Sequence, residues 1–332
     1  MELSDNAMSA ILLTSYIGIQ DVDRKPFSMG EWNLFLEKIR EHHQIPALIL
    51  SQDIDVLKEM GYQNETLERI KTLVQRGGAV AFEMESLEKK GIEVVTIFDS
   101  DYPVLLRKRL KKKAPPVLFY SGNIELAKKI GIGTAGSRNI DEDGILFTKK
   151  LAEKASMEKL LIYSGGARGA DMISEQTAVG MGGAAVSFLA DSLLSRIRRK
   201  EVIDALIRGK LLLFSDVKPD AGFSAARAMN RNKYIYASAY GTFVIASDYR
   251  KGGTWAGAVE ALKNNWGSVF VWDHGRYDGN SKLIGMGGIP YELSDKRLYE
   301  IITEKRSSYR QMEFSLSDSE LMVSEKKSGL YG

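Results

Sequence analysis

The chain of 332 residues contains no cysteine and only three histidines. Without cysteine, disulfide bonds and thiolate metal sites are excluded. None of His42, His43 and His274 has metal-ligand spacing with another histidine or with a pair of carboxylates. We therefore predict no metal and no other cofactor.

Long apolar runs are also missing. No stretch approaches the roughly 20 apolar residues that a membrane span needs. The N-terminal segment lacks a basic region ahead of its short apolar patch, so it is a poor signal peptide. Together with the absence of cysteine, this favours a cytoplasmic protein with no membrane contact.

The composition shows little excess of charge of either sign, since the net charge is only +3. Basic residues nevertheless cluster locally. Six of the seven residues from Arg107 to Lys113 are basic, and a second cluster consists of Arg196, Arg198, Arg199 and Lys200. Such clusters can form an electrostatic footprint for a phosphate backbone. A solvated surface explains either cluster equally well.

The chain divides into three segments by pattern. Residues 1–84 carry short helical patterns: one spans 28–42, with Ser28 and Glu31 spaced as a capping box, and another is expected to start at Asn64 and stop at Gly77. Residues 85–305 alternate between strand and helix patterns. Residues 306–332 are polar, which predicts a flexible tail.

The alternation predicts an α/β fold in which helices cover both faces of a parallel sheet. Two strand patterns, 92–98 and 117–120, come first. Further strands are expected at 130–134, 160–163, 184–189, 211–214, 242–246 and 268–272, with helices at 144–155, 169–179, 192–208, 223–238 and 255–264. Ligands of such sheets bind beyond the carboxyl ends of the strands.

Three glycine-rich turns fall at these strand ends: GTAGSRNI (133–140), SGGARGAD (164–171) and KGGT (251–254). Glycine lets the backbone approach a phosphate, and the N-terminus of the following helix attracts the anion. A single turn of this kind is equally explained as a connection between a strand and a helix. Taken together, they predict phosphate contacts from Gly136, Ser137, Arg138, Gly165, Gly166, Arg168, Gly252, Gly253 and Thr254.

A fourth motif, MNRNKYIYASA (229–239), interleaves cations with aromatic residues. Cations bind phosphates and aromatic rings stack on bases, so the mixture suits single-stranded nucleic acid. We add Arg231, Asn232 and Lys233 to the predicted contacts. An amphipathic helix with Tyr236 in the core is the simpler interpretation of the tyrosines.

Signatures of catalysis are weak. The first turn is not a P-loop, because no GKS or GKT follows, and no acidic residue is placed for a dinucleotide fingerprint. No nucleophile elbow appears. Arg168, Asp171 and Glu260 remain as candidates, but Asp171 suits a helix N-terminus and Glu260 a solvated helix surface. We predict no catalytic residues and no enzymatic activity.

The motifs, in order, are FDSDYP, PPVLFYSGN, GTAGSRNI, SGGARGAD, FSAARAMNRNKYI and KGGT. From about Leu87 to about Trp272 they resemble the DNA-processing protein A (DprA/Smf) family. The resemblance implies an extended Rossmann-like fold after a small helical, SAM-like domain, and homodimers that bind single-stranded DNA. It also implies that the protein assists loading of the RecA recombinase in natural transformation and DNA recombination.

The resemblance also bears on single residues. Gly136, Ser137 and Arg138 match the phosphate-contacting turn of the family, Arg168 lies in its second turn, and Arg231 with Asn232 begins its R-N-R segment. Lys233 replaces the second arginine of that segment, and Glu175 stands where the family usually has histidine.

Two alternatives to DNA binding stay open. The GGT turn, with Glu260 downstream, is similar to lysine-decarboxylase-like (LOG) proteins, which hydrolyse nucleoside monophosphates. In that interpretation Thr254 and Glu260 lie near the phosphate and ribose, and Glu260 acts as the acid. Alternatively, the same pocket binds a small nucleotide as a sensor, which would raise thermal stability by mass action.

Overall fold

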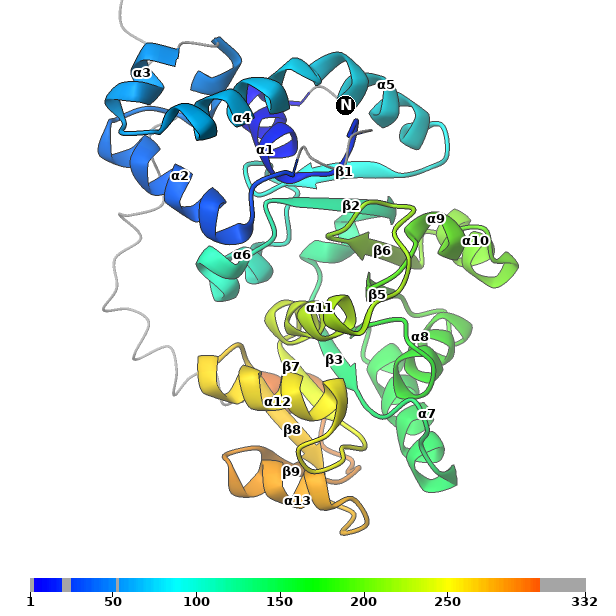
Figure 1. The fold of residues 1–332 in the computed structure, drawn as a ribbon. Helices are drawn as coiled ribbons and strands as arrows, with labels where there is room; N and C mark the ends of the chain where they lie inside the picture. Colours follow the sequence, from blue (N-terminus) through cyan, green and yellow to red (C-terminus); the bar gives the residue numbers. More distant parts are fainter. Residues whose placement is uncertain (1–2, 20–24, 52–53, 305–332) are drawn as a thin grey trace, which may run out of the picture.

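A nine-stranded sheet forms the centre of the computed structural model, which describes residues 3–19, 25–51 and 54–304 (Figure 1). Its strand order is β1-β2-β6-β5-β4-β3-β7-β8-β9. The strands are β1 (Glu93–Thr96), β2 (Val117–Gly122), β3 (Gly131–Ala135), β4 (Leu161–Ser164), β5 (Ala185–Leu189), β6 (Leu211–Ser215), β7 (Gly241–Val244), β8 (Ser268–Trp272) and β9 (Ile289–Tyr291). The predicted tail, 306–332, lies outside the described residues.

Strands β3 to β9 are all parallel, which confirms the predicted α/β class. The expectation of a wholly parallel sheet is wrong at one edge, because β1 and β2 pair antiparallel to each other and β2 pairs antiparallel to β6. The chain leaves β3 toward β4, β5 and β6, then returns to β7 on the other side of β3. This reversal of strand order creates a switch point at the carboxyl ends of β3 and β7.

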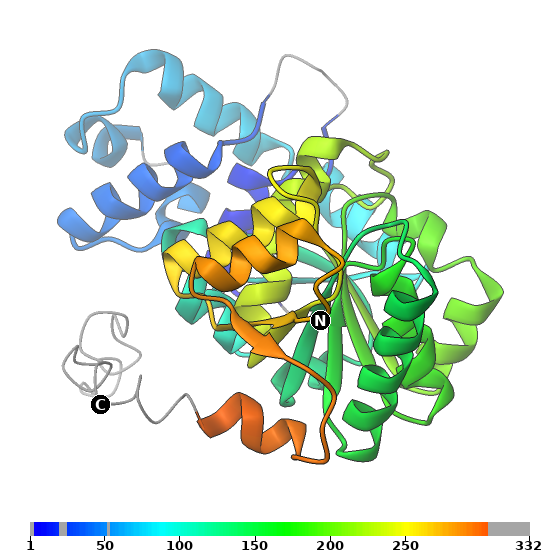
Figure 2. The ribbon, with the colours of Figure 1, turned by 90° about the horizontal axis from the view of Figure 1, so that it is seen from below.

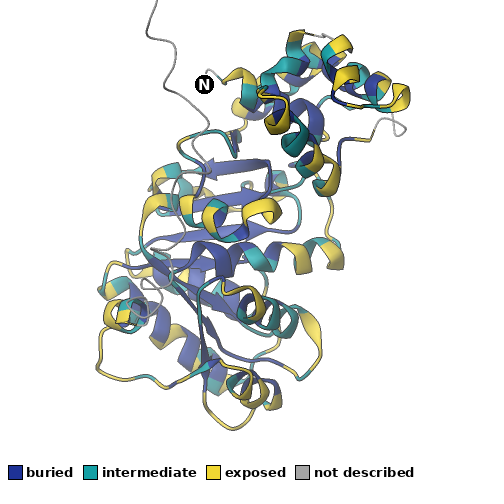
Figure 3. Cartoon of the chain, turned by 90° about the vertical axis from the view of Figure 1, so that its left-hand side faces the viewer, coloured by how far each residue is buried: buried dark blue, intermediate teal, exposed yellow. Residues whose placement is uncertain are grey.

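Helices cover both faces of the parallel part of the sheet (Figure 2). Alternate strand residues enter two separate cores, since successive side chains of a strand point to opposite faces. Ile132 and Ile162 share one core with α7, while Leu161 and Tyr163 share the other with α11 and α12. The strands are accordingly among the most buried parts of the chain (Figure 3). These helices are α7 (Glu142–Met157), α8 (Ala170–Gly180), α9 (Leu193–Arg196), α10 (Lys200–Ile207), α11 (Ala225–Ser238), α12 (Gly252–Asn264) and α13 (Asp278–Gly285).

The N-terminal part is helical, as predicted, and the capping box of Ser28 and Glu31 is present. The helix ends before Gly77, as predicted, since α4 stops at Gln75 with Arg76 as its C-cap. The immediate start of α5 at Gly77, and its continuation through residue 84 to Glu88, were not predicted. Asn64 is the first residue of α4 rather than its cap. The helices before β3 are α1 (Asp5–Thr14), α2 (Met29–Glu41), η1 (Pro46–Ser51), α3 (Ile54–Glu59), α4 (Asn64–Gln75), α5 (Gly77–Glu88), α6 (Val104–Leu110), η2 (Lys111–Lys113) and η3 (Ile124–Lys128).

Two other expectations need correction. The helix predicted at 192–208 is broken into α9 and α10, because Arg199 adopts an extended backbone and Arg196 turns into the interior. Strand β9 and helix α13 were not predicted. Pro290 lies within β9 and obscures the strand pattern, and a proline is tolerated there because β9 is an edge strand.

Candidate nucleic-acid interface

The glycine turns after β3 and β4 are packed directly against each other at the switch point. Gly169 has a φ of +89°, and a Cβ there would overlap the backbone of Ser137 and Arg138. A Cβ on Gly136 would lie 2.6 Å from that of Ala170 and 3.4 Å from that of Ile245. The Ser137 amide also donates to the carbonyl of Ala246, 3.0 Å away, beyond the end of β7. The ends of β3, β4 and β7 therefore form one continuous surface.

Two predicted cations, Arg138 and Arg168, are exposed on this surface. The Arg168 guanidinium donates to Asn139 Oδ1 at 2.6 Å, which fixes it beside the first turn. The Arg138 guanidinium lies 4.9 Å from the ring centroid of Phe223. The structure thus brings the two arginines of separate turns to the same rim.

Phe223 is a candidate functional residue that we did not predict. It precedes the Ser224 cap of α11, in the loop after β6, and is 54% exposed. An exposed phenylalanine beside an arginine offers a flat surface for a nucleobase and a cation for the adjacent phosphate. Its place in the sequence, directly before a helix, gave no signal that the loop reaches across to Arg138.

Asp171 occupies the inner side of the second turn. Its side chain is buried and accepts hydrogen bonds from the amides of Gly165 and Ala167. Burial raises the pKa of this carboxyl, while Arg231 and the two amides oppose the rise. The second turn therefore surrounds a carboxylate of the chain itself on its inner side.

Arg231 lies beneath the rim instead of on it. It is 4% exposed, and its Nη1 lies 3.5 Å from Asp171 Oδ2. The predicted role of an open phosphate contact does not match this position. The physical reason is that residue 231 lies on the buried face of α11, one turn before Tyr234 and Ile235. Burial lowers the pKa of the guanidinium.

Asn232 and Lys233 are half-buried. Asn232 donates from Nδ2 to the carbonyl of Gly253 at 2.9 Å, which joins α11 to the start of α12. Lys233 donates to Asn230 Oδ1 at 2.7 Å, and burial lowers the pKa of its amine. Hydrogen bonds within the protein thus hold both side chains.

The third turn, Gly252 to Thr254, begins α12 and has no side-chain cap. Gly252 is exposed at a φ of +73°. Glu260 lies six residues beyond Thr254, or about 9 Å along the helix. Its carboxylate pairs with Lys113 Nζ at 3.4 Å. This pairing directs Glu260 toward η2 and not toward the glycine turns.

The two basic clusters predicted from the sequence lie in different parts of the structure and make different contacts. Within Arg107–Lys113, Arg109 donates to the carbonyls of Tyr236 and Ala237, at the C-terminal end of α11. Since α11 starts at the carboxyl edge and ends at the other, Arg109 lies about 20 Å, the length of this helix, from the carboxyl edge. In the second cluster, Arg196 is buried, and its Nη2 lies 2.8 Å from Glu175 Oε1. Its neighbours Arg198, Arg199 and Lys200 are exposed after β5, on the carboxyl edge, and form no ion pair within the described ranges.

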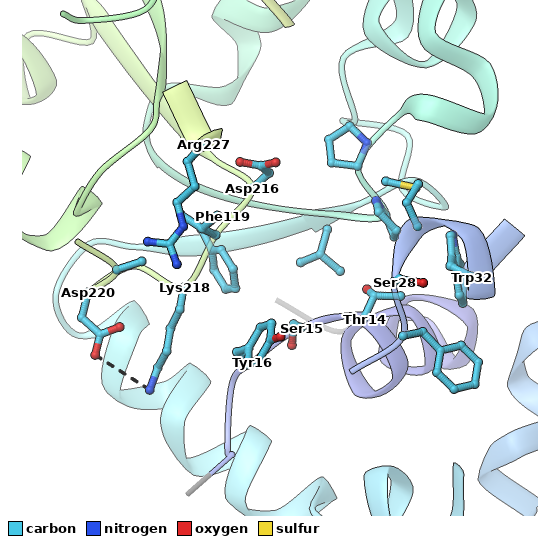
Figure 4. Close-up of a pocket in the computed structure, with 17 residues that line it drawn as sticks. Thr14, Ser15, Tyr16, Ser28, Trp32, Phe119, Asp216, Lys218, Asp220 and Arg227 are labelled. Atoms are coloured by element: carbon cyan, nitrogen blue, oxygen red, sulfur yellow. Dashed lines mark ion pairs between the residues drawn. The ribbon is translucent and has the colours of Figure 1, made fainter. Parts of the chain in front are cut away.

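A cleft of about 490 Å³ separates the N-terminal helices from the loop after β6 (Figure 4). Its charges are balanced. Lys218 pairs with Glu83 at 3.3 Å and with Asp220 at 3.8 Å, and Asp216 accepts from Tyr234 OH at 2.6 Å. Arg227 donates to the carbonyl of Gly222 at 2.6 Å. This cleft lacks the excess of positive charge that the rim has.

Within residues 3–19, 25–51 and 54–304, no group of three or more acidic or histidine side chains is arranged to hold a metal ion. No helix in this part of the chain is long and apolar enough to span a bilayer.

Residues 93–299 match the family described as DNA recombination-mediator protein A. Protein Smf from Synechocystis sp. is 27% identical over 170 residues, which is 49% of this chain and 42% of that protein. The chain thus matches less than half the length of this curated relative.

Two solved structures share the fold. DNA processing protein A from Streptococcus pneumoniae gives a TM-score of 0.64 at 22% identity, covering 88% of this chain and 95% of that one. DNA processing protein A from Helicobacter pylori, which binds single-stranded DNA, gives a TM-score of 0.53 at 19% identity, covering 65% and 96%.

Proposed function

The chain belongs to the DNA recombination-mediator protein A family, and on that premise we propose that it binds single-stranded DNA on the rim at the switch point. The observation that carries the proposal is the convergence of Arg138 and Arg168 on adjoining turns, with an exposed Phe223 against Arg138.

In this proposal the exposed arginines neutralise phosphates, and Phe223 stacks on a base. Arg198, Arg199 and Lys200 extend the footprint along the carboxyl edge. Phosphate contacts carry no sequence information and aromatic faces accept every base, so binding is independent of sequence. The buried Arg231 acts as a positioning residue that holds the second turn through Asp171.

We further propose a non-enzymatic role: the protein, as a cytoplasmic homodimer, delivers single-stranded DNA to the RecA recombinase during recombination or DNA uptake. Glu260, the candidate acid of the hydrolase alternative, is paired with Lys113. Incubation with AMP is therefore expected to release no adenine. Release of adenine would refute the non-enzymatic role.

Fluorescence anisotropy with labelled oligothymidine, at several salt concentrations, tests the binding site. Each phosphate contact on a single strand contributes about 0.7 to the slope of log K against log salt. The double variant Arg138→Gln/Arg168→Gln is expected to reduce the slope by about 1.4 and to weaken binding at every salt concentration. Duplex DNA and mononucleotides are expected to compete poorly.

The matched control removes two exposed cations at the opposite edge, in Lys108→Gln/Lys111→Gln. It loses the same charge but should bind nearly as the unmodified protein does. If the unmodified protein fails to bind at low salt, or if both double variants lose affinity equally, the assignment of DNA to this rim is refuted.

A further inference from the structure

A second group of aromatic and basic side chains lies at the start of α12, beside the rim. The ring centroids of Tyr249 and Trp255 are 5.0 Å apart, with an interplanar angle of 87°. The Arg250 guanidinium lies 5.0 Å from the Tyr249 centroid, and Lys282 Nζ lies 5.9 Å from it. None of these four residues was among the predicted contacts.

Backbone contacts hold this group in a defined shape. Asp248 and Lys251 form an isolated bridge, and the Lys251 amide donates to the carbonyl of Asp248 at 3.2 Å. Arg250 consequently adopts a φ of +57°, in the left-handed region. The amide of Tyr249 faces Asp278 Oδ1 at 3.4 Å, which ties the turn to the start of α13.

The cations of this group are not neutralised by ion pairs. Arg250, Lys251 and Lys282 form no salt bridge among the described residues, and all three are exposed. Of the two nearby acids, Asp278 accepts hydrogen bonds from the backbone amides of Tyr249 and Gly279. The other, Asp248, is exposed.

The amides that begin α12 are also available. The helix has no side-chain cap, and Gly252 is exposed at its first position. An uncapped helix N-terminus favours an anion. Here it lies next to aromatic rings and unpaired cations, so this one turn offers a phosphate site and a base-stacking surface together.

We propose that Tyr249, Trp255, Arg250 and Lys282 form a second stacking subsite, which takes one nucleotide of the strand on the β8 side of the switch point. The inference rests on the proposed function. Phe223 and Arg138 lie on the β4 side, and β7 neighbours β3 in the sheet. A strand bound at both subsites crosses the switch point.

Trp255 provides a direct probe of this subsite. It is half-exposed, whereas Trp32, Trp266 and Trp272 are at most 8% exposed. Titration with oligothymidine is expected to quench tryptophan fluorescence, and Trp255→Phe should remove most of the change while preserving affinity, because phenylalanine can still stack. Unaltered fluorescence on saturation would overturn the subsite.

Affinity gives a second, independent measurement. Tyr249→Ala is expected to weaken binding of a long oligonucleotide at least about fivefold, the lower bound for loss of one stacked base. Tyr249→Phe should bind as the unmodified protein does. The matched control is Phe82→Ala, which removes a 75% exposed aromatic side chain from α5 and should leave affinity unchanged.

Separate outcomes would refute DNA binding by the protein and nucleotide binding at the second subsite. If the unmodified protein does not bind oligothymidine, the proposed function fails. If it binds, and Arg138→Gln weakens binding while Tyr249→Ala does not, only the second subsite is refuted. An oligonucleotide without bases sharpens the test, because Tyr249→Ala should weaken binding of the normal strand but not of the abasic one.

Discussion

The guanidinium of Arg231 lies directly against the backbone of Gly165, in the space that any larger residue would need. On its other side Arg231 pairs with Asp171, which accepts the amides of the same turn. One buried arginine from α11 thus supports the loop after β4. The shape of the candidate DNA-binding rim depends on a residue that contributes little to its surface.

Replacing Gly165 by alanine should therefore affect both stability and binding. The new Cβ would overlap Arg231 Nη1, so the arginine must shift and its pairing with Asp171 must weaken. We expect a loss of about 1–3 kcal/mol in the free energy of unfolding, measured by urea denaturation, together with weaker oligothymidine binding.

Gly180→Ala is the matched control, because Gly180 ends α8 and nothing lies within 4 Å of its added Cβ. It should unfold at the same or a slightly higher urea concentration. Equal stability of Gly165→Ala and Gly180→Ala would contradict the supporting role of Arg231.

The sequence predicted the strands from β3 to β8 closely, because each is a short apolar run, and β3, β4 and β7 are each followed by a glycine-rich turn. It also placed the three turns at one edge, which the order of strands requires. It could not show which basic side chains face solvent. Arg138 and Arg231 look equivalent in the sequence, yet one stacks on Phe223 and the other is buried by the face of α11 on which it lies.

The two basic clusters also show that the sequence does not reveal which basic side chains are free to bind a ligand. The run from Arg107 to Lys113 has the higher charge density, but its two arginines bind backbone carbonyls. Two of its four lysines, Lys112 and Lys113, pair with acids from distant helices. Such pairing depends on tertiary contacts such as Lys113 with Glu260, which are 147 residues apart. Local charge density therefore does not identify the binding surface.

The buried pair of Glu175 and Arg196 leads to a second prediction. Glu175→Gln leaves the arginine charge buried without its partner, which should cost about 3–5 kcal/mol. The measurement is thermal or urea unfolding of each variant.

The double variant Glu175→Leu/Arg196→Met should be closer in stability to the unmodified protein, because apolar residues of similar volume avoid the desolvation penalty. A double variant less stable than Glu175→Gln would show that the ion pair itself is needed.

Arg138 and Phe223 should have separable effects on DNA binding. Arg138→Gln is expected to lower the slope of log K against log salt by about 0.7, since one phosphate contact is lost. Phe223→Ala should leave the slope unchanged and weaken binding by about 1–3 kcal/mol, the contribution of one stacked base. Binding titrations at four or more salt concentrations distinguish the two. A change in slope with Phe223→Ala would contradict the stacking role.

Asp141 gives a prediction about acid stability. A hydrogen bond from Tyr277 OH, at 2.6 Å, and the amide of Gly144 hold the pKa of this carboxyl at about 2. Because the folded-state pKa lies below the unfolded value, Asp141 contributes stability above about pH 4 that is lost as the pH falls toward 2. The side chain is 35% exposed, so solvent screening limits this contribution to below about 1 kcal/mol.

Asp141→Asn keeps a capping side chain but cannot ionise, so the stability difference from the unmodified protein should shrink between about pH 4 and 2. Asp141→Ala also loses the cap of α7 and should cost about 1 kcal/mol more at neutral pH. Urea unfolding at a series of pH values measures both differences. If the difference between Asp141→Asn and the unmodified protein stays constant across this range, the low pKa of Asp141 does not contribute to folding.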